Sequence, residues 1–356
     1  MNAQLLKKLF EETPRMEPQD AVKLAFQSAF GCGHLLPPKT QCTQRIRREM
    51  DETPVSDAPV FTPIGHGLCR LNLANEEVQA LRPEWIDGMM RLTDQRVRAQ
   101  TGLQERFDRT LSLMAGLAQK GEAPFSLEGF RDYLCGYDGS VVSHTDPYRE
   151  RYHPAYRVVD ENCALLVPVL AQIQRGRRLI VFDGPCGSGK TTLAGLLGEL
   201  LGITPVPMDD FFLPPRMRTQ ERLSEPGGNV HRERFADEVL ASLLAGGDVC
   251  WQRFDCGTFT LHDRRIPKSD VTVIEGSYSH HPAFRKAYDK LGALRVFVEV
   301  DAPEQLRRIE KRDPELVSMF QSRWIPLEKN YFQAYDIRSG ADVIIQSPAS
   351  GEERAR

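Results

Sequence analysis

The residues with the clearest chemical potential lie between 184 and 191, where the chain reads Gly-Pro-Cys-Gly-Ser-Gly-Lys-Thr. This segment fills every fixed position of the phosphate-binding loop pattern G-x-x-x-x-G-K-[ST]. Glycines let successive backbone N–H groups turn inward onto a phosphate. Lys190 is expected to reach the outer phosphates of a bound nucleotide, and Thr191 to ligate Mg²⁺. The predicted nucleotide-binding residues are Gly184, Pro185, Cys186, Gly187, Ser188, Gly189, Lys190, Thr191 and Thr192.

The segments on either side have the secondary structure that such a loop needs. Residues 178–183 form a short apolar run, which predicts a buried parallel strand, and residues 192–201 have apolar side chains at helical spacing. This order places the loop at a helix N-terminus, where the positive end of the helix dipole attracts phosphate. The alternative, a glycine-rich turn with an incidental lysine, does not account for both flanking elements.

Three carboxylates follow apolar runs downstream of the loop. Asp209 and Asp210 stand in Val-Pro-Met-Asp-Asp-Phe-Phe-Leu at 206–213, and Glu275 ends Val-Thr-Val-Ile-Glu at 271–275. In phosphoryl transfer, one carboxylate can accept the proton of the acceptor hydroxyl while others hold the metal ion. A solvated turn and an ordinary buried strand are the plainer interpretations, but the nearby loop favours the chemical ones.

Two arginines are candidates for covering the phosphates. Arg308 and Arg312 are four residues apart in a predicted helix and therefore share one face. Guanidinium groups placed this way can stabilise the charge of a transferring phosphoryl group. The alternative is a solvated basic face that pairs with Glu304 and Glu310.

The chain of 356 residues is long enough for about two domains. Beyond residue 178, predicted strands alternate with predicted helices, which favours an α/β fold with a parallel sheet that binds ligands at the carboxyl ends of its strands. The strands are predicted at 178–183, 204–208, 271–275, 294–300 and 342–345, and the helices at 190–201, 233–245, 281–290, 303–313 and 317–334.

The region before residue 135 has mainly helical spacing. Helices are predicted at 21–30, 75–80, 83–98 and 103–118, loops at 31–38 and 63–70, a connection at 137–158 and a further helix at 161–175. The predicted division is a mostly α-helical domain with a linker at 1–158 and an α/β nucleotide-binding domain at 159–350.

The composition is that of a globular protein, with 41% hydrophobic and 27% charged residues. A net charge of −3 gives no basic field for nucleic acid or an anionic membrane. No apolar run is long enough to span a bilayer, and the N-terminus lacks the features of a signal peptide. Eight cysteines without a C-x-x-C pair indicate reduced thiols. A cytoplasmic protein is therefore expected, and homo-oligomerisation stays open.

Residues 178–346 resemble the uridine kinase family of P-loop kinases, which includes nicotinamide riboside kinases and, more distantly, phosphoribulokinases. The matching segments follow the family's order over about half of the chain. They are 184–192, Met-Asp-Asp-Phe-Phe at 208–212, Gly-Asn at 228–229, Phe-Asp at 254–255, Val-Ile-Glu-Gly at 273–276, 308–313 and Ala-Asp-Val-Ile-Ile at 341–345. Trp-Ile-Pro-Leu-Glu-Lys-Asn-Tyr-Phe at 324–332 adds a likeness to bacterial uridine-kinase-like proteins.

This resemblance implies a P-loop NTPase fold that uses ATP and Mg²⁺ to phosphorylate a small hydroxyl compound, with a nucleoside as the expected acceptor. Asp209 is then the base, and Thr191, Glu275 and Asp209 surround Mg²⁺. The implied catalytic cations are Lys190, Arg308 and Arg312, and the implied substrate-binding residues are Asp210, Phe211, His231, Phe254, Asp255 and His262.

The chain departs from the family at two places. His231 stands where the family has a ribose-binding Asp, and the lid after Arg312 is short, with Pro314 and no arginine before Arg323. Both departures leave the acceptor open, whether another nucleoside or a different hydroxyl compound. The choice between ATP and GTP as donor is also open.

The N-terminal half contains two features of uncertain meaning. Cys32 and His34, together with His66 and Cys69, are a set that could bind Zn²⁺, take part in separate nucleophilic or acid–base chemistry, or simply pack around glycine turns. Residues 144–157 are dense in Tyr, His and Arg, which suits stacking on bases and phosphate binding but also suits a packed linker.

The sequence thus favours an ATP- and Mg²⁺-dependent kinase of a nucleoside-like compound, fused to a helical domain. A second hypothesis makes the P-loop half a nucleotide-responsive switch that controls the N-terminal domain or a partner. A third makes the N-terminal half an enzyme that acts on the same metabolite.

Overall fold

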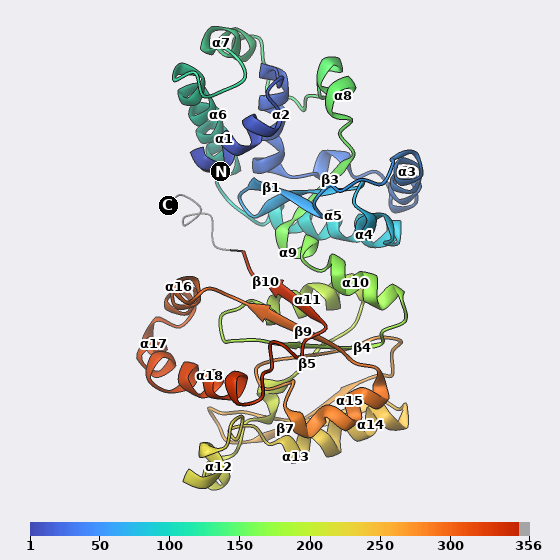
Figure 1. Cartoon of the computed structure of the whole chain (residues 1–356), viewed down its shortest axis with the longest axis vertical. Helices are drawn as coiled ribbons and strands as arrows, with labels where there is room; N and C mark the ends of the chain where they lie inside the picture. The colour runs from blue at the N-terminus through green and yellow to red at the C-terminus, as the bar shows by residue number, and fades with distance from the viewer. Residues whose placement is uncertain (349–356) are drawn as a thin grey trace. The chain divides into compact units, whose positions relative to one another are not determined.

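The computed structural model describes residues 1–348, which form two compact units, residues 1–167 and 168–348 (Figure 1). The predicted domain boundary between residues 158 and 159 stays a prediction. Residues 349 and 350, the last two of the predicted second domain, lie outside the described residues. None of the helices in residues 1–348 combines the length and the apolar character needed to cross a bilayer.

The first unit contains helices close to the predicted ones. They are α2 (Pro18–Phe30), α4 (Glu76–Gln79), α5 (Pro83–Arg98) and α6 (Leu103–Gln119). The unit also contains α1 (Ala3–Glu12), α3 (Lys39–Glu52), α7 (Leu127–Cys135), α8 (Asp146–Tyr152) and α9 (Glu161–Ala164). The helix predicted over 161–175 is two helices, α9 and α10 (Val167–Gln174), with α10 beginning where the units divide.

An antiparallel sheet in this unit corrects two predictions. Strands β1 (Phe61–Gly65), β2 (Leu68–Asn72) and β3 (Tyr156–Asp160) pair in that order. The predicted loop at 63–70 is therefore wrong, and the predicted connection at 137–158 instead contains α8 and the start of β3. Proline and glycine made residues 63–67 look like a loop, but here they form a bulge and a tight turn between strands, with Gly65 and Gly67 at φ 91° and 75°.

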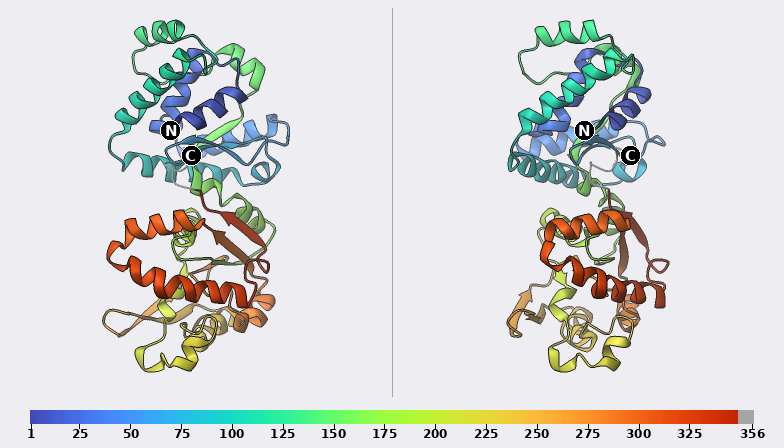
Figure 2. Two further views of the ribbon diagram at one scale, coloured as in Figure 1. Left: turned by 60° about the vertical axis from the view of Figure 1, so that its left-hand side comes forward. Right: turned by 90° about the vertical axis from the view of Figure 1, so that its left-hand side faces the viewer.

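The second unit is the predicted α/β fold. Its five-stranded parallel sheet has the order β10-β9-β4-β8-β5 and is flanked by helices (Figures 1 and 2). The strands, β4 (Leu179–Asp183), β5 (Val206–Pro207), β8 (Thr272–Glu275), β9 (Leu294–Glu299) and β10 (Val343–Gln346), fall inside or within one residue of the predicted ranges. Parallel pairing brings the carboxyl ends of β4, β5 and β8 to one edge.

Helix α11 (Lys190–Leu201) follows the phosphate loop as predicted. Two other predicted helices contain π-helical turns. The first runs from α13 (Arg232–Phe235) through such a turn into α14 (Ala241–Ala245), and the second runs from α17 (Val317–Met319) through 320–324 into α18 (Ile325–Ala334). The remaining helices are α12 (Gln220–Ser224), α15 (Arg285–Leu291) and α16 (Ala302–Arg312).

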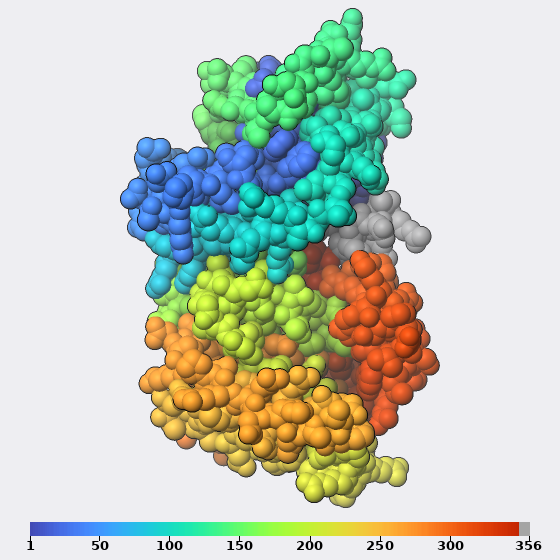
Figure 3. All heavy atoms as spheres, turned by 180° about the vertical axis from the view of Figure 1, so that it is seen from behind, coloured from blue at the N-terminus to red at the C-terminus, as the bar shows by residue number. Residues whose placement is uncertain are grey.

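A hairpin of β6 (Val249–Phe254) and β7 (Leu261–Ile266) has no counterpart among the predicted elements. Most of β7 is exposed, and its residues Leu-His-Asp-Arg-Arg-Ile do not show the apolar pattern of a strand. The hairpin and its flanking segments spread over the outer surface of the second unit in Figure 3 (gold to orange). Its inner side adds Val249 and Trp251 to a hydrophobic core beneath the strand ends.

Candidate active site

The phosphate loop has a backbone that only glycine accommodates at its key positions. Gly184, Gly187 and Gly189 have φ values of 148°, 74° and 94°. A Cβ atom on Gly184 would lie 2.3 Å from the carbonyl oxygen of Val298. Because neither the φ value nor this distance tolerates a side chain, glycine at 184 keeps the loop backbone close to β9.

Two polar side chains of this loop are buried and lack strong hydrogen-bond acceptors. The Ser188 hydroxyl has no hydrogen-bond partner among residues 1–348. The Lys190 side chain is buried, and its ammonium donates only a 3.3 Å hydrogen bond to the Pro185 carbonyl. Burying a cation and a hydroxyl without strong acceptors is costly, and an anionic group inside the loop would satisfy both. The residues present therefore fit a polyphosphate.

Thr191 and Glu275 form an oxygen-rich pair beside the loop. The Thr191 hydroxyl donates to a Glu275 carboxylate oxygen at 2.8 Å. Burial raises the pKa of Glu275, and the negative charges of Asp209 and Asp210 raise it further. The hydrogen bond from Thr191 and the positive charge of Lys190 act in the opposite direction. A carboxylate beside other negative charges attracts a cation, and Mg²⁺ prefers oxygen ligands of this kind.

The two aspartates after β5 have opposite environments. Asp210 is buried and accepts a 2.7 Å hydrogen bond from the Trp251 indole, and the Arg253 guanidinium lies 3.8 Å away. Burial raises the pKa of Asp210, opposed by those two partners. Asp209 is exposed and makes no hydrogen bond within residues 1–348. Asp210 thus anchors the segment to the hairpin, and Asp209 is the carboxylate available to an incoming molecule.

The two arginines that are predicted to cover the phosphates, Arg308 and Arg312, have different contacts. Arg308 donates to the carbonyl of Gly187 at 3.0 Å, to the Ser347 hydroxyl at 2.9 Å and to the Pro348 carbonyl at 2.7 Å. It therefore lies directly on the phosphate loop. Arg312 donates instead to its neighbour Asp313 at 2.5 Å and is 58% exposed. The structure brings Arg308 to the loop, where it also pairs with Glu304 at 2.6 Å as the alternative interpretation expects. It gives Arg312 no contact with the loop.

Two of the predicted substrate-binding residues have structural partners. Phe211 is fully buried and packs edge-on against Phe235 at 5.1 Å, so it belongs to the core rather than to the surface of a pocket. His231 caps helix α13, where its Nδ1 accepts from the backbone N–H of Arg234 at 3.3 Å. His231 thus has a structural role as a helix cap.

The other three predicted residues lie on the hairpin. Phe254 is buried at the end of β6. Asp255 shapes the turn, because its carboxylate accepts from the backbone N–H groups of residues 257 and 258 at 2.8 and 3.0 Å, and these bonds lower its pKa. His262 is exposed and contacts the Thr260 hydroxyl at 2.9 Å. Since Trp251 joins this hairpin to Asp210, the hairpin forms one flank of the Asp209 region.

A buried carboxylate at the end of β4, which the sequence pattern does not single out, organises the site. Asp183 is fully buried and accepts hydrogen bonds from the backbone N–H of Gly184 at 2.7 Å, from that of His280 at 2.8 Å and from the Tyr331 hydroxyl at 2.9 Å. It therefore ties the phosphate loop to the segment after β8 and to α18. An acid at the end of an apolar strand was the only sequence signal.

A second cluster reaches the loop from α18. Glu328 is buried and accepts from the backbone N–H of Cys186 at 2.8 Å and from the Ser277 hydroxyl at 2.7 Å. Burial raises the pKa of the Cys186 thiol to about 12, and Glu328 adds to the shift, so this thiol is unreactive in the loop.

Tyr278, after β8, has a φ of 75°, a strained backbone conformation that often occurs at functional sites.

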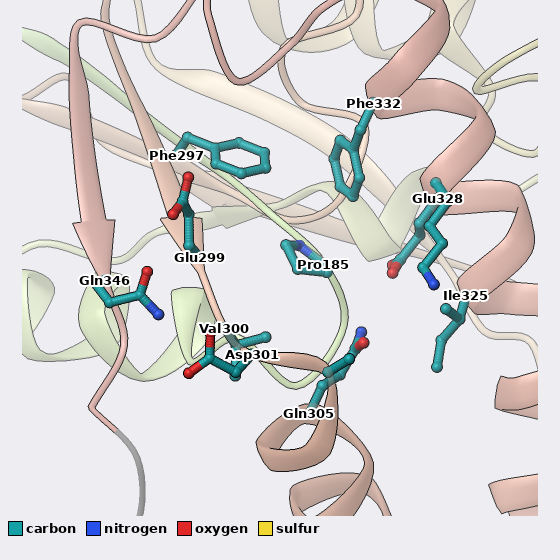
Figure 4. Close-up of a pocket in the computed structure, with 12 residues that line it drawn as sticks. Pro185, Phe297, Glu299, Val300, Asp301, Gln305, Ile325, Glu328, Phe332 and Gln346 are labelled. Carbon is teal, nitrogen blue, oxygen red and sulfur yellow. The ribbon is translucent and has the colours of Figure 1, made fainter.

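A cavity of about 250 Å³ lies against the outside of the loop. Figure 4 shows Pro185 at its centre, between Gln305 of α16 and Glu328 of α18, with Phe297 and Phe332 above. Gln305 also donates to the Cys186 carbonyl at 2.8 Å. Helices α16 and α18 are therefore both joined to the loop backbone around this cavity.

The cysteine and histidine pairs of the first unit do not form a metal centre in the structure. Residues 1–348 contain no group of three or more His, Cys, Asp or Glu side chains placed to hold a metal ion. The Cys32 thiol contacts the Met90 carbonyl at 3.4 Å, and Cys69 is buried in β2. His34 packs edge-on against Phe26.

No protein-family model and no curated protein matches the chain in sequence. Solved structures resemble about half of it. A protein described as a possible uridine kinase from Bacillus stearothermophilus is 24% identical over 48% of this chain and 89% of its own, with a TM-score of 0.37. A shikimate kinase from Bacteroides thetaiotaomicron is 15% identical over 48% of this chain and 86% of its own, with a TM-score of 0.27.

Proposed function

We propose that this protein is an ATP-dependent kinase that transfers a phosphoryl group to a hydroxyl of a small molecule. One arrangement carries the proposal. The Thr191–Glu275 oxygen pair lies beside the phosphate loop, and the charge of the exposed Asp209 contributes to the raised pKa of Glu275. A polyphosphate cradle, a metal-binding oxygen pair and an accessible carboxylate are the parts that phosphoryl transfer requires.

The residues divide the work as follows. The loop backbone and Lys190 bind the phosphates, and Arg308, already in contact with the loop, adds a second positive charge near them. Mg²⁺, held by Thr191 and Glu275, would neutralise the phosphate charge. Asp209 orients the acceptor hydroxyl and takes its proton. Asp210, fixed by Trp251, keeps Asp209 in position.

A nucleoside is the acceptor that we propose first, because the 208–212, 254–255 and 273–276 segments resemble uridine kinases. The acceptor would lie between Asp209 and the β6–β7 hairpin. His231 caps a helix at the position where uridine kinases have a ribose-binding carboxylate, so we propose that this chain contacts its acceptor differently. The same test should therefore include other hydroxyl compounds.

The test is ATP consumption by the full chain with Mg²⁺ against a panel of nucleosides, sugars and vitamins, with Lys190→Ala as the control. Stimulation by one acceptor, abolished in the control, would establish the kinase and identify its substrate. Hydrolysis that no acceptor stimulates would contradict the proposal and favour a nucleotide-responsive switch.

A further inference from the structure

A chain of buried hydrogen bonds crosses the first unit, far in sequence from the phosphate loop. The carboxylate of Asp20 accepts from Nδ1 of His144 at 2.8 Å, and Nε2 of His144 lies 2.6 Å from the hydroxyl of Tyr156. Gln27 donates to that hydroxyl at 3.2 Å and accepts from Arg70 at 2.9 Å. Both Asp20 and His144 are buried.

The direction of every bond in this chain is determined. Asp20 can only accept, so His144 donates from Nδ1 and accepts from Tyr156 at Nε2. Burial lowers the pKa of His144 to about 4, which keeps its imidazole neutral in this arrangement. The Gln27 amide then has its nitrogen toward Tyr156 and its oxygen toward Arg70. The chain therefore fixes the position of the Arg70 guanidinium, which also lies over the Tyr156 ring at 4.5 Å.

Two cations at the end of this chain, Arg70 and Lys23, lack a close counter-ion, whereas Arg149 lies 3.6 Å from Asp146. Arg70 is only 7% exposed, and neither it nor Lys23 has a carboxylate within ion-pair distance in residues 1–348. Burial and the charges of Arg70 and Arg149 lower the pKa of Lys23 to about 8, against the opposing charge of Asp20. The charges of these three cations, on α2, β2 and α8, thus act on one another. A buried guanidinium without an acid partner is costly, and a bound anion removes that cost.

The approach to this cluster is open on one side. The Arg149 side chain is 52% exposed, and Lys23 and Tyr156 are partly exposed. Arg70 thus forms the inner end of the cluster and Arg149 the outer end. Two guanidinium groups and an ammonium match the charge and the several acceptor oxygens of a phosphate better than the single charge of a carboxylate.

We propose that Lys23, Arg70 and Arg149 form a second ligand site, which binds the phosphate group of a small molecule. The Asp20–His144–Tyr156–Gln27 chain positions Arg70 for this purpose. Residues 144–157, rich in Tyr, His and Arg, then supply part of a binding site in the first unit. The site is independent of the proposed kinase centre, because none of its residues belongs to the second unit.

The experiment is calorimetric titration of inorganic phosphate, and in parallel of phenyl phosphate, into the full chain carrying Lys190→Ala. That background weakens binding at the phosphate loop, and sodium chloride at equal ionic strength controls for general screening. We expect one phosphate site whose affinity falls at least about tenfold in Lys23→Met and in Arg149→Gln. The exposed substitutions Lys120→Met and Arg131→Gln serve as matched controls and should change nothing.

Arg149 is at the surface, so its variant tests the site without endangering the fold. Tighter binding of phenyl phosphate than of phosphate would identify an organic phosphate as the ligand, and equal binding would identify free phosphate. Absence of binding at millimolar phosphate would overturn the proposal. Binding that both Lys23→Met and Arg149→Gln leave unchanged would overturn it as well.

Discussion

Glu328 accepts a hydrogen bond from the backbone N–H of Cys186 at 2.8 Å, across 142 residues of sequence. The contact joins helix α18 to the phosphate loop, and the second oxygen of Glu328 holds Ser277 after β8. One buried carboxylate therefore connects the phosphate loop, helix α18 and the segment that follows β8. The shape of the loop depends on side chains from distant elements as well as on its own glycines.

Replacing Glu328 by Ala should weaken nucleotide binding and lower stability. The change leaves the Cys186 N–H without its acceptor, at a cost of about 1–3 kcal/mol for a buried unsatisfied group. The Ser277 hydroxyl keeps its second acceptor, the Gly184 carbonyl at 3.0 Å. Thermal unfolding and titration of a fluorescent ATP analogue would measure both effects. Glu310→Ala, an exposed change on α16, is the control. A variant that matches this control in both measurements would show that Glu328 does not support the loop.

Gly184→Ala should abolish nucleotide binding. Its Cβ would be forced to within 2.3 Å of the Val298 carbonyl oxygen at a φ of 148°, so the loop must move away from β9. Gly195→Ala in α11 is the matched control, since nothing lies within 4 Å of its added Cβ. That control should gain up to about 1 kcal/mol in unfolding free energy from helix propensity. Equal ATP affinity in the two variants would contradict the assigned role of Gly184.

The second unit was largely predictable because its signals are contiguous. Strand, glycine loop and helix occupy residues 179–201, and the run ending at Glu275 is apolar and β-branched. Once the sheet is parallel, those strand ends must meet, so Asp209 and Glu275 could be brought to the loop from sequence alone.

The missed features depend on contacts between distant segments. Tyr331 and Asp183 are 148 residues apart, and neither looks unusual in its own segment. Strand β2 pairs with β3, from which several helices separate it in sequence. The turn between β1 and β2 is rich in glycine, so the local pattern favoured a loop. The polar strand β7 becomes a strand by pairing with β6 rather than by burying an apolar face.

Asp209→Asn should reduce turnover by about 10² or more while ATP binding is retained, because the amide cannot take the proton of the acceptor hydroxyl. Asp210→Ala should instead reduce stability, since the buried indole N–H of Trp251 then loses its acceptor. Single-turnover assays and urea unfolding would separate the two effects. Normal turnover in Asp209→Asn would mean that another group is the base.

His144 should make the protein less stable in mild acid. Its pKa is lowered from 6.5 to about 4 by burial in the fold, whereas the unfolded chain takes up the proton near 6.5. Between these two values the unfolded state binds more protons, so the unfolding free energy must fall as the pH falls through this window. The loss attributable to His144 is at most about 3 kcal/mol.

The comparison that isolates His144 is urea unfolding of the natural protein and of His144→Gln at pH 7 and pH 5. His66 and His281, whose pKa values burial also lowers to about 4, contribute equally to both proteins. The variant should be less stable at pH 7, because Asp20 and Tyr156 lose a buried partner, but it should lose less stability on going to pH 5. Identical losses in the two proteins would mean that His144 is already protonated in the fold. The hydrogen-bond direction that positions Arg70 would then be reversed at Tyr156.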